Sequence, residues 1–548
     1  MSRLRRQSLP ADPPRDLDPA RLVRGTRGAV ASPQYLASEA GLGVLRAGGN
    51  AIDAAVATNA ALAVVASHSC GLGGDAFWLI WDGGELHALN GSGRSARGAT
   101  IEAAHAAGLK EMPVRGPWTV TVPGAIRSWG DAHARFGKLH WADLLAPAID
   151  LADGFPATDG WVNSVERSAA VFGTSGDWAQ TFRPNGRPWS VGQVVRLPNL
   201  AQTLRTLAKD GAEAAYSGSL AKQAAAYLED RGSPLRATDF ADQESTWTDP
   251  ISIDYRGYTS VTHPANAAGP MALEMLGILG NFDAPRTADD PAWIHVGLES
   301  ARLALADRDG FLTDPDHMPA GAADNFTNPA RLAQLAATID PERAGPIPQM
   351  AMQRGGTVFL ATGDGDGNLV SLIESNWMGF GSGLVDPATG ISYHNRGSLF
   401  RLDPTHPNAL APHKRTFHTL TPGFLLRNGK PWIAHGSMGG EIQPQVFAQF
   451  VSAVVDRGLD IATALAVPRW LAQPQGFLGP PTVSLLERRF SPEVAAELKR
   501  RGHDVRWGEA FNSRMGHANA VEMVPADNGD VTLAAATDPR TEGAALAW

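Results

Sequence analysis

The sequence holds a single cysteine, Cys70, among 548 residues. One cysteine excludes an internal disulfide and a cysteine-rich metal site, and the small, apolar neighbours of Cys70 predict a buried packing role. Apolar runs are short, and no stretch of about eighteen apolar residues is present to span a membrane. Basic residues are also not in excess, because 47 Lys and Arg face 56 Asp and Glu. The resulting net charge of -9 gives no reason to expect nucleic acid as a partner.

The first 24 residues, beginning MSRLRRQSLPADPPRDLDP, contain basic residues and prolines but no apolar segment. A secretory signal requires such a segment. The sequence therefore predicts a disordered N-terminal tail over 1–24 and a cytoplasmic protein that does not use a membrane as a partner. The composition of the whole chain, 43% hydrophobic and 19% charged, is typical of a soluble globular protein.

A threonine follows two glycines in the stretch RGGTVFLATGDGDGNLVSL, which covers residues 354–372. Apolar, β-prone residues follow Thr357, then the turn-forming run GDGDGN, then a second apolar segment, LVSLIES. The pattern predicts a β-hairpin whose first strand begins at the bond between Gly356 and Thr357. Thr357 can be an ordinary residue at the start of a strand. If the bond before it were cut, however, Thr357 would carry both a hydroxyl nucleophile and a free α-amine to act as its base.

Other blocks of the sequence predict layers of helices and sheets. Apolar residues at helical spacing indicate a helix over 36–45, and an alanine-rich run at 51–65 is apolar all round, which indicates a buried helix. The turn GLGGD at 71–75 leads into the strand AFWLIW. Helices and strands joined by glycine-rich corners are typical of a layered α/β domain. Residues 314–353, rich in Pro, Gly, Ala and Asp, predict instead a mobile loop leading to Thr357.

Two further features can contribute chemistry beside such a nucleophile. Gly439 and Gly440 lie between the strand PWIAHG and a helix that begins near Pro444. Successive backbone N–H groups at such a place can stabilise developing negative charge on one oxygen, although a tight turn alone also explains the pair. Ser375 ends the strand that is predicted to pair with the Thr357 strand. Its hydroxyl can hydrogen-bond the nucleophile, or it can be an exposed serine at a strand end.

These blocks together resemble the gamma-glutamyltranspeptidase family over nearly the whole chain, from about residue 25 to the C-terminus. The resemblance implies an α+β fold, the four-layered αββα sandwich of the N-terminal-nucleophile hydrolases, which are made as one chain and cut themselves. The matching bond is Gly356–Thr357. Cleavage there would give a large subunit, residues 25–356, and a small subunit, residues 357–548, that remain together as a heterodimer.

The resemblance also assigns catalytic roles to the residues around Thr357. In the family the Gly-Gly pair forms the oxyanion hole, which here implies Gly439 and Gly440. A Thr or Ser occupies the position of Ser375, which implies a role in holding the nucleophile. Thr357 itself would attack first the carbonyl before it and later the amide of the substrate.

The specificity pocket matches the family less well than the catalytic residues do. Glutamyl-specific members hold the α-carboxylate of the substrate with an Arg in a motif similar to FRExAP, and in the corresponding LNGSGRSA that Arg is replaced by Ser92, with Arg94 two residues along. They hold the α-amine with an acid after a motif similar to NNQMDD, where HNRGSLF places Leu399. The serine pair that usually precedes MSP is His418-Thr419 here.

Arg94, Arg396 and His418, with Thr419, predict instead a cationic pocket for a carboxylate, which a guanidinium recognises through a fixed fork of donors. The expected function is a self-processing N-terminal-threonine amidohydrolase or acyltransferase that cleaves a gamma-glutamyl or similar small acidic amide through an acyl-enzyme. Two alternatives remain open. One is a hydrolase of oxamate or of a glutaryl-type amide, as in the related cephalosporin acylases, and the other is an uncleaved, inactive binding protein. No cofactor is expected, and the fifteen histidines show no HxxxH pair, so no metal is expected either.

Overall fold

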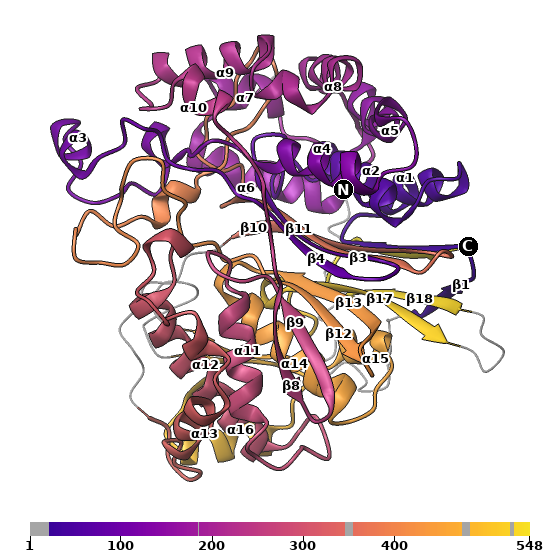
Figure 1. The fold of residues 1–548 in the computed structure, drawn as a ribbon, viewed down its shortest axis with the longest axis vertical. Helices are drawn as coiled ribbons and strands as arrows, with labels where there is room; N and C mark the ends of the chain where they lie inside the picture. Colours follow the sequence, from indigo (N-terminus) through magenta and orange to yellow (C-terminus); the bar gives the residue numbers. More distant parts are fainter. Residues whose placement is uncertain (1–20, 185, 346–354, 474–482, 526–530) are drawn as a thin grey trace, which may run out of the picture.

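Two seven-stranded sheets lie face to face at the centre of the molecule, and helices cover both outer faces (Figure 1). The computed structural model describes residues 21–184, 186–345, 355–473, 483–525 and 531–548. The first sheet has the strand order β1-β18-β17-β13-β12-β9-β8, and the second has the order β19-β2-β10-β11-β3-β4-β7. This arrangement confirms the predicted α+β fold with four layers, αββα.

The strands of the first sheet are β1 (Val23–Gly25), β8 (Ile251–Tyr255), β9 (Tyr258–Thr262), β12 (Pro422–Arg427), β13 (Lys430–Met438), β17 (His517–Pro525) and β18 (Val531–Thr537). Those of the second are β2 (Gly28–Ser32), β3 (Asp75–Asp82), β4 (Leu86–Gly91), β7 (Thr246–Thr248), β10 (Gly356–Asp364), β11 (Asn368–Trp377) and β19 (Ala544–Ala547). Two small sheets consist of β5 (Phe155–Pro156) with β6 (Val194–Val195), and of β14 (Trp470–Gln473), β15 (Val483–Glu487) and β16 (Asp504–Gly508).

Helices from the N-terminal half lie on the side of the second sheet, and α3 projects from that side (Figure 1). They are α1 (Tyr35–Arg46), α2 (Ala51–Val65), α3 (Ile101–Ala106), α4 (Ala125–Phe136), α5 (Trp141–Asp153), α6 (Asp159–Phe172), α7 (Asp177–Phe182), α8 (Pro198–Asp210), α9 (Ser219–Asp230) and α10 (Ala237–Ala241). The first sheet is covered by α11 (Gly269–Leu279), α12 (Pro291–Phe311), α13 (Pro329–Ala337), α14 (Gln443–Val455), α15 (Ile461–Ala466) and α16 (Pro492–Arg500).

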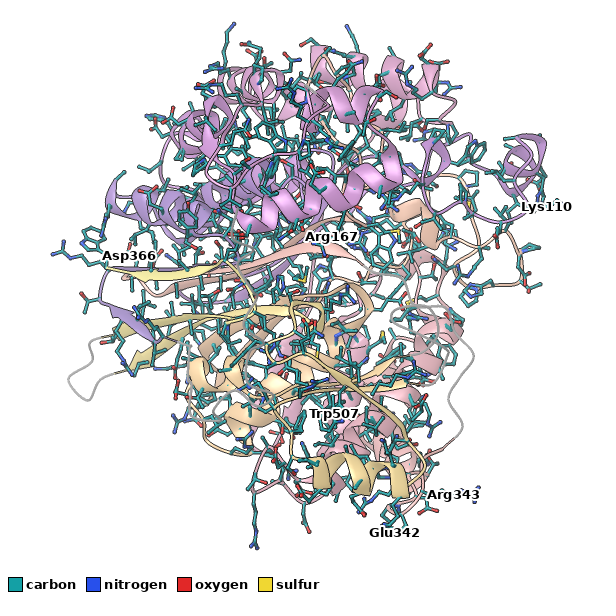
Figure 2. All side chains as sticks on the ribbon, turned by 180° about the vertical axis from the view of Figure 1, so that it is seen from behind. Lys110, Arg167, Glu342, Arg343, Asp366 and Trp507 are labelled. Atoms are coloured by element: carbon teal, nitrogen blue, oxygen red, sulfur yellow. The ribbon has the colours of Figure 1, made fainter. Side chains whose placement is uncertain are left out.

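The predicted hairpin around Thr357 is the centre of the second sheet. Strands β10 and β11 pair in antiparallel register, with Leu360 opposite Leu372, and the side chain of Asp364 accepts N–H bonds within the turn between them. Figure 2 shows Asp366, in this turn, at the outer edge of the molecule. The opposite end of β10, where Thr357 lies, is buried.

Both predicted N-terminal helices are present, and the second one packs against the hairpin. Every residue of α2 is buried, as its predominantly small and apolar sequence predicts. Its start is fixed by a capping box between Asn50 and Asp53, and the backbone N–H of Ala51 donates to Asp364 across 2.8 Å. A separate apolar core, which includes Phe77, Phe359 and Phe424, fills the space between the two sheets. Strand β10 is thus held from both faces.

Two sequence expectations about flexible segments need correction. Val23 and Arg24, placed in the predicted tail, pair with β18 as part of β1, while residues 1–20 lie outside the described residues. The predicted loop at 314–353 contains two 3₁₀ turns and α13 over its described part, residues 314–345, because Asn328 caps α13 and Leu332 buries its side chain. Within the described residues, no helix combines the length and the apolar character needed to cross a membrane.

Candidate active site

Thr357 lies at the start of β10 with only 1% of its surface exposed. Its hydroxyl donates to the hydroxyl of Ser375 across 3.1 Å, and Ser375 in turn donates to the carbonyl oxygen of Gly356 across 2.7 Å. The backbone N–H of Trp377 donates to the same Ser375 oxygen at 2.8 Å and so orients that hydroxyl. Ser375 is fully buried and is therefore not an exposed serine at a strand end. One hydroxyl thus contacts both the candidate nucleophile and the carbonyl of the bond before it.

Gly439 and Gly440 follow β13 of the first sheet and lie against the segment that precedes Thr357. Their φ angles are 148° and 64°, a region that favours glycine. Gly440 begins a 3₁₀ turn that leads into α14, as the sequence predicts. The Cα of Gly440 lies 2.9 Å from the point where a Cβ on Gly355 would stand. The absence of side chains therefore lets the glycine pair reach the backbone next to the Gly356–Thr357 bond.

Arg396 is fully buried behind Trp377, whose ring lies between it and the backbone before Thr357. Its guanidinium lies over the ring of Trp377, 4.8 Å from the ring centroid, and the Trp377 ring is 3.1 Å from where a Cβ on Gly355 would stand. Nη1 of Arg396 donates to Oγ1 of Thr419 across 3.0 Å. Burial lowers the pKa of Arg396 to about 9, and the nearby charge of Asp75 acts against that shift. Arg396 is therefore a cation at neutral pH.

The other two nitrogens of Arg396, Nε and Nη2, are buried without a partner among the described residues. These two nitrogens lie on one edge of a guanidinium and form the fork that binds a carboxylate with two parallel hydrogen bonds. Arg540 shows this geometry in the same molecule, since its Nε and Nη2 donate to the two oxygens of Glu487 across 2.6 and 2.7 Å. In Arg396 the corresponding edge can serve a ligand.

Asp75 and His418 form a buried pair next to Arg396. The register of β3 and β11 places Asp75 opposite Ser375, on the same face of the sheet. Oδ2 of Asp75 lies 3.0 Å from Nε2 of His418. Burial raises the pKa of Asp75 to about 7, whereas burial and the charge of Arg396 hold the pKa of His418 well below its usual range. His418 is therefore neutral near pH 7 unless a ligand changes its surroundings.

The structure corrects the predicted three-membered cationic pocket. Nη1 of Arg94 donates to Asp314 across 3.0 Å and to the carbonyl of His413 across 3.2 Å. In the described part of the chain, no hydrogen bond or ion pair joins Arg94 to Arg396 or His418. Arg94 is held elsewhere because the buried carboxylate of Asp314 binds it, and His418 lacks a charge. Among the described residues, a hydrogen bond thus joins Arg396 to Thr419, the residue after His418, whereas Arg94 is paired with Asp314.

The two positions that depart from the glutamyl-binding pattern offer neither a cation nor an acid. The hydroxyl of Ser92 donates to the side chain of Asn90 across 2.6 Å. Leu399 lines an open hollow together with Arg308, Phe417 and Glu441. Glu441, which follows Gly440 directly, also lines the hollow but pairs with Arg308 at 2.9 Å. Position 399 thus offers no carboxylate, and the one on Glu441 is paired with Arg308.

Among the described residues, one group could offer a metal ion three ligands, and it lies outside the candidate site. The ligand atoms of His295, Glu299 and His503 lie within 4.8 Å of one another. Hydrogen bonds already account for both imidazoles: Nδ1 of His295 is 2.8 Å from Nε2 of His503, and the outer nitrogens contact the carbonyl of Asp340 and the hydroxyl of Ser484. The geometry needs no ion, and the predicted absence of a metal stays a prediction.

Sequence reasoning missed three residues of this region. Asp75 sits in the turn GLGGD but gave no signal, because its partner His418 is 343 positions away. Trp377 has an unusual φ of 72° and separates Arg396 from the backbone before Thr357. Glu374 is fully buried, accepts bonds from the N–H of Gly71 and from Asn59, and has its pKa raised by burial to about 8. Only the acidic character of positions 75 and 374 inside apolar strands could have marked them.

Comparisons with known proteins agree with this geometry. The family model for gamma-glutamyltranspeptidase matches residues 37–548. The glutathione hydrolase-like YwrD proenzyme of Bacillus subtilis is 35% identical over 96% of this chain and 99% of its own length. The oxamate amidohydrolase proenzyme of Klebsiella pneumoniae is 37% identical over 95% and 99%, respectively.

Solved structures extend the similarity to the whole fold. The crystal structure of cephalosporin acylase from Bacillus halodurans matches with a TM-score of 0.90 and 38% identity, covering 100% of this chain and 99% of the other. These relatives share the N-terminal-nucleophile hydrolase fold, and they act on C–N bonds. With Thr357, Ser375 and the glycine pair assembled around one peptide bond, the chain belongs to the gamma-glutamyltranspeptidase family and is an amidohydrolase or transpeptidase of the N-terminal-nucleophile class.

Proposed function

We propose that this enzyme hydrolyses small amides whose acyl group carries a carboxylate, without specificity for the gamma-glutamyl group. The observation that carries the proposal is the buried edge of Arg396, whose Nε and Nη2 have no partner among the described residues. A buried donor left unpaired costs about 1–3 kcal/mol, so the site favours a ligand that satisfies both nitrogens. A carboxylate does this with two parallel bonds.

Two of the similar proteins support a substrate other than a gamma-glutamyl amide. Oxamate, the substrate in the name of one relative, is an amide with a carboxylate attached directly to its carbonyl carbon. The similar solved structure is a cephalosporin acylase. Recognition of a gamma-glutamyl group would also require a partner for the α-amine, and Leu399 offers none. Ser92, in place of the family Arg, is bonded within the protein. The proposal therefore favours an oxamate-type or glutaryl-type acyl group.

The nucleophile would be made by the chain itself. In the intact chain, the hydroxyl of Thr357 would attack the carbonyl carbon of Gly356, and the peptide bond would become an ester through an N-to-O shift. Water would then cleave the ester, leaving a carboxylate on Gly356 and a free α-amine on Thr357. Ser375 already donates to the Gly356 oxygen across 2.7 Å and would stabilise the negative charge that develops there.

The two fragments, residues 25–356 and 357–548, would remain one molecule after cleavage. Strands β10 and β11 belong to the second fragment but pair with β2 and β3 of the first. The fragments therefore share a continuous hydrogen-bonded sheet as well as the core between the sheets. This interleaving supports a stable heterodimer.

In turnover the Thr357 hydroxyl would attack the carbonyl carbon of the substrate amide while its α-amine takes the hydroxyl proton. The backbone N–H groups of Gly439 and Gly440 would bind the resulting oxyanion. Collapse of this intermediate would break the C–N bond, and the ammonium form of the Thr357 α-amine would return the proton to the leaving amine. Water, or an acceptor amine in acyl transfer, would then release the acyl group. Arg396 would hold the carboxylate of the acyl group throughout.

Matched substrates test the proposal. Oxamate is compared with its neutral counterpart oxamide, and glutaric monoamide with butanamide and with glutamine, by measuring ammonia release from the processed enzyme. We expect a higher kcat/KM for the two acidic amides than for their neutral counterparts, and no advantage for glutamine over glutaric monoamide. Equal rates on neutral and acidic amides would refute the role of the carboxylate, and a preference for glutamine would restore gamma-glutamyl specificity.

A further inference from the structure

We propose that Asp75 is a positioning residue that acts through His418 to give the carboxylate of the substrate a second hydrogen-bond donor. This inference rests on the proposed function, because it concerns the same carboxylate that Arg396 would hold. It adds a specificity determinant that comes from β3, the strand next to the hairpin that carries Thr357 and Ser375.

The contacts of Asp75 leave one ring nitrogen of His418 for a ligand. Oδ1 of Asp75 accepts the N–H groups of Gly93 and Gly124 across 3.1 and 3.0 Å, so its orientation is fixed. Oδ2 lies 3.0 Å from Nε2 of His418. The other ring nitrogen, Nδ1, is buried and has no partner among the described residues. His418 directly precedes Thr419, whose hydroxyl accepts a hydrogen bond from Arg396.

The proton between Asp75 and His418 decides what Nδ1 can do. When Asp75 is ionised, Nε2 carries the ring proton and donates to Oδ2, so Nδ1 is an acceptor. A carboxylate would then meet a lone pair and not a donor. When the pair holds one more proton, either Asp75 donates to Nε2 or the ring is an imidazolium, and Nδ1 carries a proton in both cases. Only the protonated pair can therefore donate to a carboxylate.

The negative charge of a bound substrate would favour protonation of the Asp75–His418 pair. The other titratable or charged groups that face the pair are Arg396, Arg415, His394, His263, Glu374 and Tyr216. Burial lowers the pKa of His394 to about 3 and of His263 to about 4, and it raises the pKa of Glu374 to about 8. Near pH 7 the pair is thus surrounded by two guanidinium groups and neutral side chains.

A carboxylate placed between Arg396 and His418 offsets the positive field of the guanidinium groups and so favours protonation of the pair. Because only the protonated pair would bind the carboxylate, binding takes up one proton. The affinity for the substrate therefore falls about tenfold for each unit by which the pH exceeds the pKa of the free pair. Since the pKa of Asp75 is raised to about 7, KM for an acidic amide should rise above neutral pH.

The variant Asp75→Asn removes this dependence while keeping the contacts. The Asn oxygen can accept from Gly93 and Gly124, and its amide can donate to Nε2 of His418, which leaves a permanent proton on Nδ1. We expect KM of the wild type for oxamate to rise about tenfold per unit between pH 7.5 and 9, and KM of Asp75→Asn to stay flat and lower at pH 9. Glu522→Gln, which changes a carboxyl on β17 whose charged neighbours are Arg24, Asp460 and Arg427, should keep the wild-type slope.

Processing into two fragments shows that Asp75→Asn has folded. A parallel slope in Asp75→Asn and wild type would overturn the inference, as would a flat wild-type profile. If the variant fails to fold, calorimetry on the wild type decides instead. Oxalate or glutarate is bound at pH 8 in buffers of different ionisation enthalpy, and uptake of a substantial fraction of one proton is expected. Binding without proton uptake refutes only the role of Asp75, whereas no binding and no hydrolysis of acidic amides refute the proposed function itself.

Discussion

Replacement of Arg396 by Met should cost the enzyme most of its preference for acidic amides. The substitution keeps an unbranched apolar stem beside Trp377 and removes the two donors, Nε and Nη2, that have no partner in the described ranges of the chain. Hydrogen bonds to charged groups contribute about 1.5–3 kcal/mol each, so two of them correspond to about 3–6 kcal/mol. The Met variant also no longer carries two unpaired buried donors in the free enzyme. This gain is the same whichever substrate is tested, so it does not change the comparison between acidic and neutral amides. We expect kcat/KM for oxamate to fall by at least about 100-fold.

The assay compares this loss with the loss on a neutral substrate. Oxamide lacks the carboxylate, so its kcat/KM should change by less than about fivefold in Arg396→Met, and the ratio of the two changes isolates the carboxylate contact. Arg396→Lys keeps the charge but not the fork, and it should lie between wild type and Met. Equal losses on oxamate and oxamide, in variants that still process and keep their Tm, would refute the reasoning.

The remaining predictions concern the nucleophile, the oxyanion site and stability. Ser375→Ala removes the donor to the Gly356 oxygen and should slow self-cleavage by about 100–1,000-fold, measured by mass spectrometry as the loss of intact chain. The control Ser375→Thr keeps a hydroxyl and should keep the rate within about tenfold. Unchanged cleavage in the Ala variant would contradict the role of Ser375. Gly439→Ala places a Cβ 2.6 Å from Ile442 at a φ of 148° and should lower kcat about 10–100-fold with little change in KM, so a wild-type kcat would argue against an oxyanion contact. Burial raises the pKa of Glu374 from 4.5 to about 8, so the stability linked to its protonated form is complete below pH 4.5 and lost as pH rises to 8, on the order of 5 kcal/mol. In a Thr357→Ala background, Glu374→Gln should flatten the fall in urea-unfolding free energy between pH 6.5 and 8, and identical slopes would refute this assignment.

The parts of the fold that depend on local pattern could be predicted from the sequence. The hairpin around Thr357 follows from β-prone residues on either side of a Gly/Asp turn, and α2 follows from a run in which every position is small or apolar. The glycine pair at 439–440 could be placed between a strand and a helix for the same reason. These features depend on neighbours within about twenty residues.

The specificity site depends on contacts between residues far apart in the chain, which local sequence patterns do not predict. Arg94 and Arg396 were equivalent candidates as cations. They differ because Asp314 binds the first, whereas Thr419 is the one hydrogen-bond partner that the described residues give the second. Asp314 was itself assigned to a mobile loop, since the burial that fixes it comes from distant elements. The charge of His418 depends on its burial and on Asp75, which no local pattern connects to it.

The most direct test of the account is the mass of the purified protein after incubation at neutral pH, measured beside a Thr357→Ala variant. We expect two fragments in the wild type that meet at Gly356 and Thr357, with a free α-amine on Thr357, and an intact chain in the variant. An intact wild-type chain under all conditions would contradict the self-made nucleophile and favour an inactive binding protein. Cleavage of the variant at the same bond would show that Thr357 does not perform the reaction.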